Sequence, residues 1–119
     1  MRTFVVAALV AAFTPLAAAA DLTQRGNVVR PTGPSSFEVP WRGSSGPRDF
    51  WCVAGEYARY DLNLPGRTRL YRTSPLPRRA GDGVRFSTSP EGAQLTGLAL
   101  IGGGNSISVA HALLQCNRR

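Results

Sequence analysis

The fold is decided by one stretch, PRDFWCVAGEYARY at positions 47–60, where helix-forming residues, aromatic side chains and a cysteine coincide. Pro47 suits the first position of a helix, because its missing N–H would have no intrahelical partner there, and Gly46 or Ser45 can precede it as the cap. Asp49 then places a negative charge near the positive end of the helix dipole. The stretch therefore predicts the main helix of the protein.

One side of this predicted helix is apolar, and the other side carries a cysteine and a glycine. At about 100° per residue the apolar stripe collects Phe50, Val53, Ala54 and Tyr57, flanked by Trp51, Ala58 and Tyr60. Cys52 and Gly55 lie on the opposite side. Because a glycine lets another segment approach closely, we expect a second segment to cross the helix at Gly55 and to meet Cys52.

The start of the chain has the pattern of a secretory signal peptide. Arg2 precedes the apolar run FVVAALVAAF at positions 4–13, and Ala18-Ala19-Ala20 offers small residues for cleavage. The run is too short for a comfortable membrane span. We expect a signal peptide over 1–20, cleavage after Ala20 and a periplasmic or secreted protein without a transmembrane span; a buried N-terminal helix is the alternative.

Export favours a disulfide between the two cysteines, Cys52 and Cys116, because oxidising compartments stabilise such bonds. The alternative is a pair of thiols that hold a metal. Structural zinc takes four ligands, and the chain offers only His111 as a further soft ligand and has no C-x-x-C spacing. We therefore expect neither a metal nor a cofactor.

After the signal peptide, the chain is long enough for one compact domain. Residues 21–36 contain few apolar side chains and several glycines and prolines, so they predict an extended N-terminal arm that need not be ordered. Residues 37–119 then form the single domain.

Within this domain, alternating apolar and polar residues predict strands at 37–41 and 84–88, and strand-forming residues predict another at 67–74. The apolar run at 95–101 is typical of a strand buried on both faces. At the C-terminus, Val109, Ala112, Leu113 and Cys116 recur at helical spacing after a cap at Ser106 or Ser108, which favours a short helix over a strand. The predicted fold is α+β: a small antiparallel sheet of three to four strands packed against the main helix, with a short C-terminal helix tied on by the disulfide.

Positive charge is concentrated in one part of the chain. All 14 basic residues are arginines, against seven acids, which gives a net charge of +7 and can reflect no more than a GC-rich genome. The predicted strand, loop and strand carry six of them, opposed by Asp82 alone and accompanied by Tyr71: Arg67, Arg69, Arg72, Arg78, Arg79 and Arg85.

Paired strands would gather these charges on one surface, where guanidinium groups bind phosphate or carboxylate and Tyr71 and Phe86 can stack on a ring. We expect a non-enzymatic binding protein whose partner is an anionic cell-envelope component or another exported protein, with nucleic acid left open. The alternative is an ordinary solvated sheet face, in which the stems of the arginines cover apolar surface.

Catalytic chemistry has little support in the sequence. A hydrolase would need the one histidine, His111, beside a nucleophile, and no Gly-x-Ser-x-Gly elbow is present. The glycine run at 102–104 does not complete a dinucleotide motif, because Ile107 stands where the last glycine belongs. No catalytic residue is assigned; a small secreted hydrolase that uses His111, or an inhibitor of a secreted enzyme, is the alternative.

Three sequence features together resemble a known group of proteins: FWCxxGxY at 50–57, LYR at 70–72, and the segment from Ser108 to Cys116. They are similar to small uncharacterised exported proteins of alphaproteobacteria, over the chain from about Phe37 onward. The resemblance implies no activity.

Overall fold

The computed structural model describes residues 21–42, 46–76, 78–98 and 104–116. The predicted signal peptide at 1–20 lies outside these ranges. Within them, no helix has the length and apolar character needed to cross a bilayer.

The main helix α1 spans Pro47–Glu56 and continues as a π-helical turn over Tyr57–Asp61. It begins as predicted: Pro47 is the first helical residue, Gly46 is the cap, and the Gly46 N–H donates to the Asp49 carboxylate at 2.8 Å. The π turn ends where Asn63 takes a left-handed conformation with φ 57°, a common way to terminate a helix.

The sheet is antiparallel throughout, and its strands follow the order β1-β2-β3-β5-β4-β6. The strands are β1 (Asp21–Leu22), β2 (Val28–Gly33), β3 (Ser36–Val39), β4 (Arg69–Arg72), β5 (Val84–Ser87) and β6 (Ser106–Ser108). The C-terminal helix α2 spans Val109–Leu114. The α+β class is confirmed, but the sheet has six strands among the described residues rather than three to four.

Two of the additional strands come from residues 21–36, so the prediction of a separate extended arm was wrong. β1 pairs with β2, and β2 pairs with β3 with Arg30 opposite Glu38. Val29 is completely buried. A strand of low apolar content is stable here because the neighbouring ladders satisfy its backbone groups and one side chain anchors it in the core.

The strand predicted at 95–101 is also wrong for the part that the structure describes. Residues 95–98 are irregular, Leu95 is 66 % exposed, and Gly97 turns the chain with φ +78°; residues 99–101 lie outside the described ranges. The residue before this segment, Gln94, forms an isolated bridge to β4, in which its N–H donates to the Arg72 carbonyl at 2.7 Å. β6 takes the edge position beside β4.

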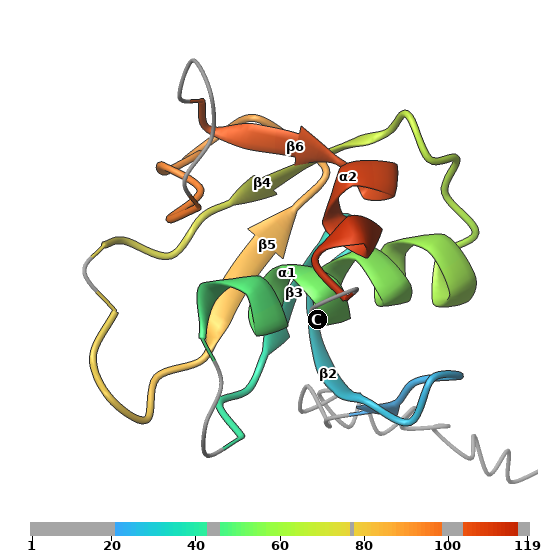
Figure 1. The fold of residues 1–119 in the computed structure, drawn as a ribbon, viewed down its shortest axis with the longest axis horizontal. Coiled ribbons are helices and arrows are strands. Elements are labelled where there is room, and N and C mark those ends of the chain that lie inside the picture. The colour runs from blue at the N-terminus through green and yellow to red at the C-terminus, as the bar shows by residue number, and fades with distance from the viewer. Residues whose placement is uncertain (1–20, 43–45, 77, 99–103, 117–119) are drawn as a thin grey trace, which may run out of the picture.

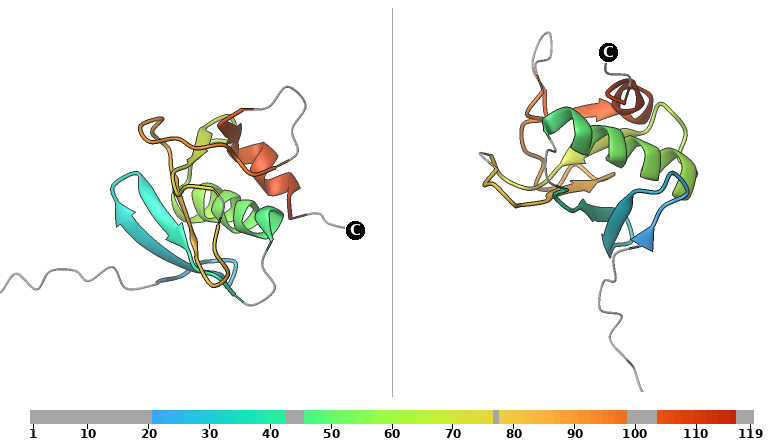
Figure 2. Two further views of the ribbon diagram at one scale, coloured as in Figure 1. Left: turned by 90° about the vertical axis from the view of Figure 1, so that its left-hand side faces the viewer. Right: turned by 60° about the horizontal axis from the view of Figure 1, so that its bottom comes forward.

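Helix α1 lies across one face of the sheet, and α2 lies beside it (Figures 1 and 2). The core between helix and sheet is aromatic: Trp51 meets Phe86 edge-on at 4.8 Å, and Phe37 contacts Tyr57 at 4.7 Å. This packing confirms that the predicted apolar stripe faces inward.

The crossing of α1 and α2 is the one expected at Gly55. A Cβ atom there would come within 2.8 Å of the Ala112 Cβ, so only glycine fits without a shift. The Cys52–Cys116 disulfide joins α1 to the turn that directly follows α2. Ser108 caps α2 by accepting a hydrogen bond from the His111 backbone N–H at 3.0 Å, so the C-terminal helix is confirmed as well.

Candidate functional site

The alternation of β4 separates the predicted arginine surface into two parts. Leu70 and Arg72 point to the helix side and are buried, whereas Arg69 is exposed on the other side with the half-buried Tyr71. Arg72 is only 3 % exposed. The six arginines therefore do not share one surface, and placing Arg72 on the solvated face was wrong.

Three of the predicted binding residues, Arg67, Arg69 and Tyr71, line neither of the two hollows beside the loop between β4 and β5. Arg69 is engaged with β6: its Nη2 donates to the Ser106 hydroxyl and carbonyl, both at 2.9 Å. Arg67 is exposed before β4, and Tyr71 sits opposite Ser106 and Ser87. These contacts describe an ordinary polar sheet face.

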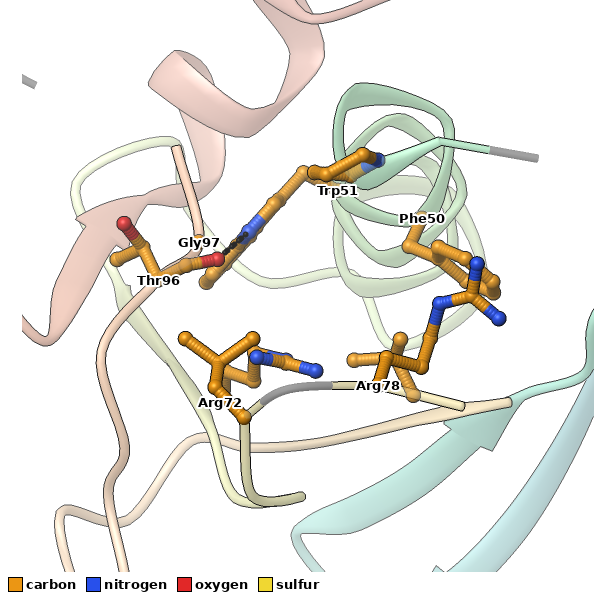
Figure 3. A pocket seen from close by; sticks show the side chains of 9 residues that line it. Phe50, Trp51, Arg72, Arg78, Thr96 and Gly97 are labelled. Carbon is orange, nitrogen blue, oxygen red and sulfur yellow. Dashed lines mark hydrogen bonds between the residues drawn. The ribbon is translucent and has the colours of Figure 1, made fainter. Parts of the chain in front are cut away.

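The other four arginines surround the loop between β4 and β5, where two hollows adjoin. The smaller one, which we name the Arg72 cavity, has a volume of about 70 Å³ and opens between α1, this loop and residues 96–97 (Figure 3). Its walls are apolar or aromatic and consist of Pro47, Phe50, Trp51, Leu76 and Val84, completed by Arg72, Arg78, Thr96 and Gly97.

Arg72 is the unusual residue of this cavity. Its Nη1 atom is buried and has no hydrogen-bond partner among the described residues, and no acidic side chain lines the cavity. Burial lowers the pKa of the Arg72 guanidinium from its ordinary value, and the positive charge of Arg78 lowers it further. The group nevertheless stays charged, because a guanidinium does not lose its proton in proteins. A buried charge without a partner is costly.

Trp51 fixes the roof of the cavity. Its indole Nε1–H donates to the Thr96 carbonyl at 2.9 Å, which holds residues 96–97 against α1 (Figure 3). A Cβ atom on Gly97 would lie 3.8 Å from the Arg72 Nη1, so the chain passes close to the guanidinium. Across the cavity, the Arg78 guanidinium stacks on Phe50 with 5.0 Å between its carbon and the ring centre.

The larger space, which we name the arginine hollow, has a volume of about 490 Å³ and shares Leu76 and Arg78 with the Arg72 cavity. It also presents Arg79 and Arg85, both exposed and without a hydrogen-bond partner for their side chains among the described residues. Its two acids are Glu38 and Asp82.

Two of the residues that border this hollow already have structural partners. The carboxylate of Glu38 is paired with Arg30 at 2.8 Å. Arg78 donates to the carbonyls of Arg79 and Asp82, so it shapes the loop. Among the described residues of the arginine hollow, Arg79 and Arg85 are therefore the arginines whose side chains are free to bind a partner.

The groups that a hydrolase or a metal site would need are not assembled in the described residues. The His111 imidazole makes no hydrogen bond to a serine or an acid there, and the Ser106 hydroxyl is occupied by Arg69. Cys52, Glu56 and Cys116 converge within 4.8 Å, but both sulfurs belong to the disulfide and are not free to ligate as thiolates.

The sequence contained a signal for the inward position of Arg72. Leu70 and Tyr71 are adjacent, so only one of them can face the core, and choosing Leu70 also turns Arg72 inward. The contributions of Trp51, Thr96 and Gly97 had no such signal, because they depend on how residues 96–97 fold back onto α1.

No family model, no curated protein and no solved structure matches the chain.

We expect Arg72→Met to raise the free energy of unfolding by about 1–3 kcal/mol, because methionine keeps the buried stem and removes a charge that has no partner. Urea unfolding in a buffer of small inorganic ions would measure this change. Arg85→Met, at an exposed position of the next strand, is the control and should stay within about 0.5 kcal/mol of wild type. A loss of stability in Arg72→Met would show that the guanidinium supports the fold.

Proposed function

We propose that the protein is a non-enzymatic binding protein of the periplasm or cell exterior, and that it holds an anionic partner at the Arg72 cavity and the arginine hollow. The observation that carries this proposal is the buried guanidinium of Arg72, which lacks a counter-charge among the described residues. Proteins seldom retain such a group unless a ligand or a partner satisfies it. The exposed Arg79 and Arg85 next to it supply further positive charge.

The location rests on the disulfide. A bond between Cys52 and Cys116 fits an oxidising compartment. The pattern at the start of the chain supports export to the same kind of compartment. An anionic cell-envelope component and an exported protein with an acidic surface both meet these conditions.

Heparin is a suitable polyanionic probe for this proposal. We expect the affinity of wild type for heparin to fall steeply with rising salt, because binding releases counterions. Arg79→Gln/Arg85→Gln should weaken binding about 10- to 30-fold at low salt, since each arginine near an anionic surface contributes about 1 kcal/mol. It should also make the salt dependence shallower. Affinity measurements at several sodium chloride concentrations would test both points.

Arg48→Gln/Arg67→Gln is the matched control, because it removes the same net charge at exposed positions that line neither hollow. Its affinity should stay within about threefold of wild type. Equal losses in the two double variants would mean that net charge alone attracts heparin, and the arginine hollow would lose its role.

A further inference from the structure

The Arg72 cavity combines one buried guanidinium that has no partner with apolar walls, and the second arginine of its lining, Arg78, donates to the carbonyls of Arg79 and Asp82. The polar groups of its roof are already used: the Trp51 N–H donates to the Thr96 carbonyl, and the Thr96 hydroxyl oxygen accepts from the Leu98 N–H at 3.2 Å. Among the described side chains, Arg72 Nη1 is the one buried donor without a partner. Such a site complements a group that carries one negative charge on an apolar body.

The volume of the cavity limits what can enter it. A space of about 70 Å³ compares with about 10–15 Å³ for one water-sized group on the same measure, so about five to seven groups fit. A carboxylate with two to four carbons, which has about four to six heavy atoms, has this size. Larger ligands can only insert one end, because the cavity continues past Leu76 and Arg78 into the arginine hollow.

We propose that the Arg72 cavity binds one alkyl carboxylate, supplied either by a free short-chain acid or by the end of a larger molecule. This inference deepens the function proposed above and rests on it. The carboxylate accepts from the Arg72 guanidinium, and its alkyl chain lies against Phe50, Trp51 and Val84.

A phosphate group suits this cavity less well than a carboxylate. At neutral pH a phosphate monoester carries close to two negative charges and three strong acceptor oxygens. Among the described side chains, Arg72 Nη1 is the one unpartnered buried donor, because Arg78 already donates to two loop carbonyls, so the remaining phosphate oxygens would lie against apolar walls without a donor, which is costly. The cavity thus selects the carboxylate by the number of acceptor oxygens that its one unpartnered donor group can satisfy and by the apolar character of the attached chain.

Titration with sodium butyrate at constant ionic strength tests the proposal, with the NMR signal of the Trp51 indole N–H as the probe. We expect a saturable shift with a dissociation constant on the order of 1–10 mM, as suits a ligand of six heavy atoms. The neutral isostere butyramide should produce no saturable shift. The exposed Trp41 supplies an internal reference signal that should not move.

Two variants identify the group responsible. Arg72→Met should weaken butyrate binding at least tenfold. Arg69→Met removes an arginine from the same strand but on the opposite face, and it should bind butyrate within about twofold of wild type. Equal binding by Arg72→Met and wild type would overturn the proposal, provided that circular dichroism shows both to be folded.

Further ligands separate the two sources of the carboxylate and the two proposals. A short peptide with a free C-terminal alanine that binds more tightly than butyrate, and loses binding when amidated, would support a chain end; comparable binding of butyrate would support a free acid.

A Trp51 shift with inorganic phosphate but with no carboxylate would reject the carboxylate and leave the anion-binding function standing. If no anion shifts the Trp51 signal while heparin still binds through Arg79 and Arg85, only the proposal of a carboxylate in the Arg72 cavity fails.

Discussion

Removal of the Cys52–Cys116 disulfide is expected to lower the free energy of unfolding by about 2–5 kcal/mol. The bond closes a loop with a sequence separation of 64, for which the chain-entropy model gives about 4 kcal/mol. Domains of this size have total stabilities of only about 5–15 kcal/mol, so the loss is large. Urea unfolding of Cys52→Ala/Cys116→Ala and wild type, followed by circular dichroism, would measure it.

Two controls accompany this measurement. Wild type reduced with dithiothreitol should lose a similar amount of stability, because reduction opens the same loop. Mass spectrometry of the non-reduced exported protein should show the loss of two hydrogens relative to the reduced chain. Free thiols in the exported protein, or a loss below about 1 kcal/mol in the double variant, would contradict the expectation.

The helices could be predicted from local chemistry. Pro47 and Asp49 mark the beginning of α1, and Ser108 marks the beginning of α2, because caps and first-turn charges act within a few residues. The crossing at Gly55 followed from one steric fact, the missing side chain opposite the core stripe. The disulfide then had one possible pair of partners.

The sheet could be predicted only in part, since its order depends on distant partners. β3 and β5 had clear alternation and β4 was rich in strand-forming residues, whereas β2 contains few apolar residues and β6 has only three residues. Each of these two strands is held by the backbone ladder of its neighbour and by one buried anchor, Val29 in β2 and Ile107 in β6. Composition within a short window cannot reveal such a ladder.

The candidate site shows the same division between local and distant information. The arginine-rich segment from Arg67 to Arg85 was evident in the sequence, and four of its six arginines do line the two hollows. The Arg72 cavity could not be foreseen, because it forms only when Trp51 on α1 binds the Thr96 carbonyl, and these two residues are 45 positions apart in the sequence. The chemical character of the Arg72 cavity arises from the way these distant residues pack together.

Trp51→Ala is expected to lower the free energy of unfolding by about 3–5 kcal/mol. The side chain is 1 % exposed, meets Phe86 edge-on at 4.8 Å and donates a hydrogen bond to the Thr96 carbonyl at 2.9 Å. Alanine would leave a cavity in the core and an unsatisfied carbonyl next to Arg72. Urea unfolding followed by circular dichroism suits this variant, because the method does not depend on tryptophan fluorescence.

The chain offers a matched control in its other tryptophan, Trp41, which is 42 % exposed. Trp41→Ala should change stability by no more than about 0.5 kcal/mol, since the position lies outside the core. Trp51→Phe should fall between the two, because it keeps a ring against Phe86 and loses the hydrogen bond to Thr96, which contributes about 1 kcal/mol. Similar losses for Trp41→Ala and Trp51→Ala would contradict the burial of Trp51 and, with it, the roof of the Arg72 cavity.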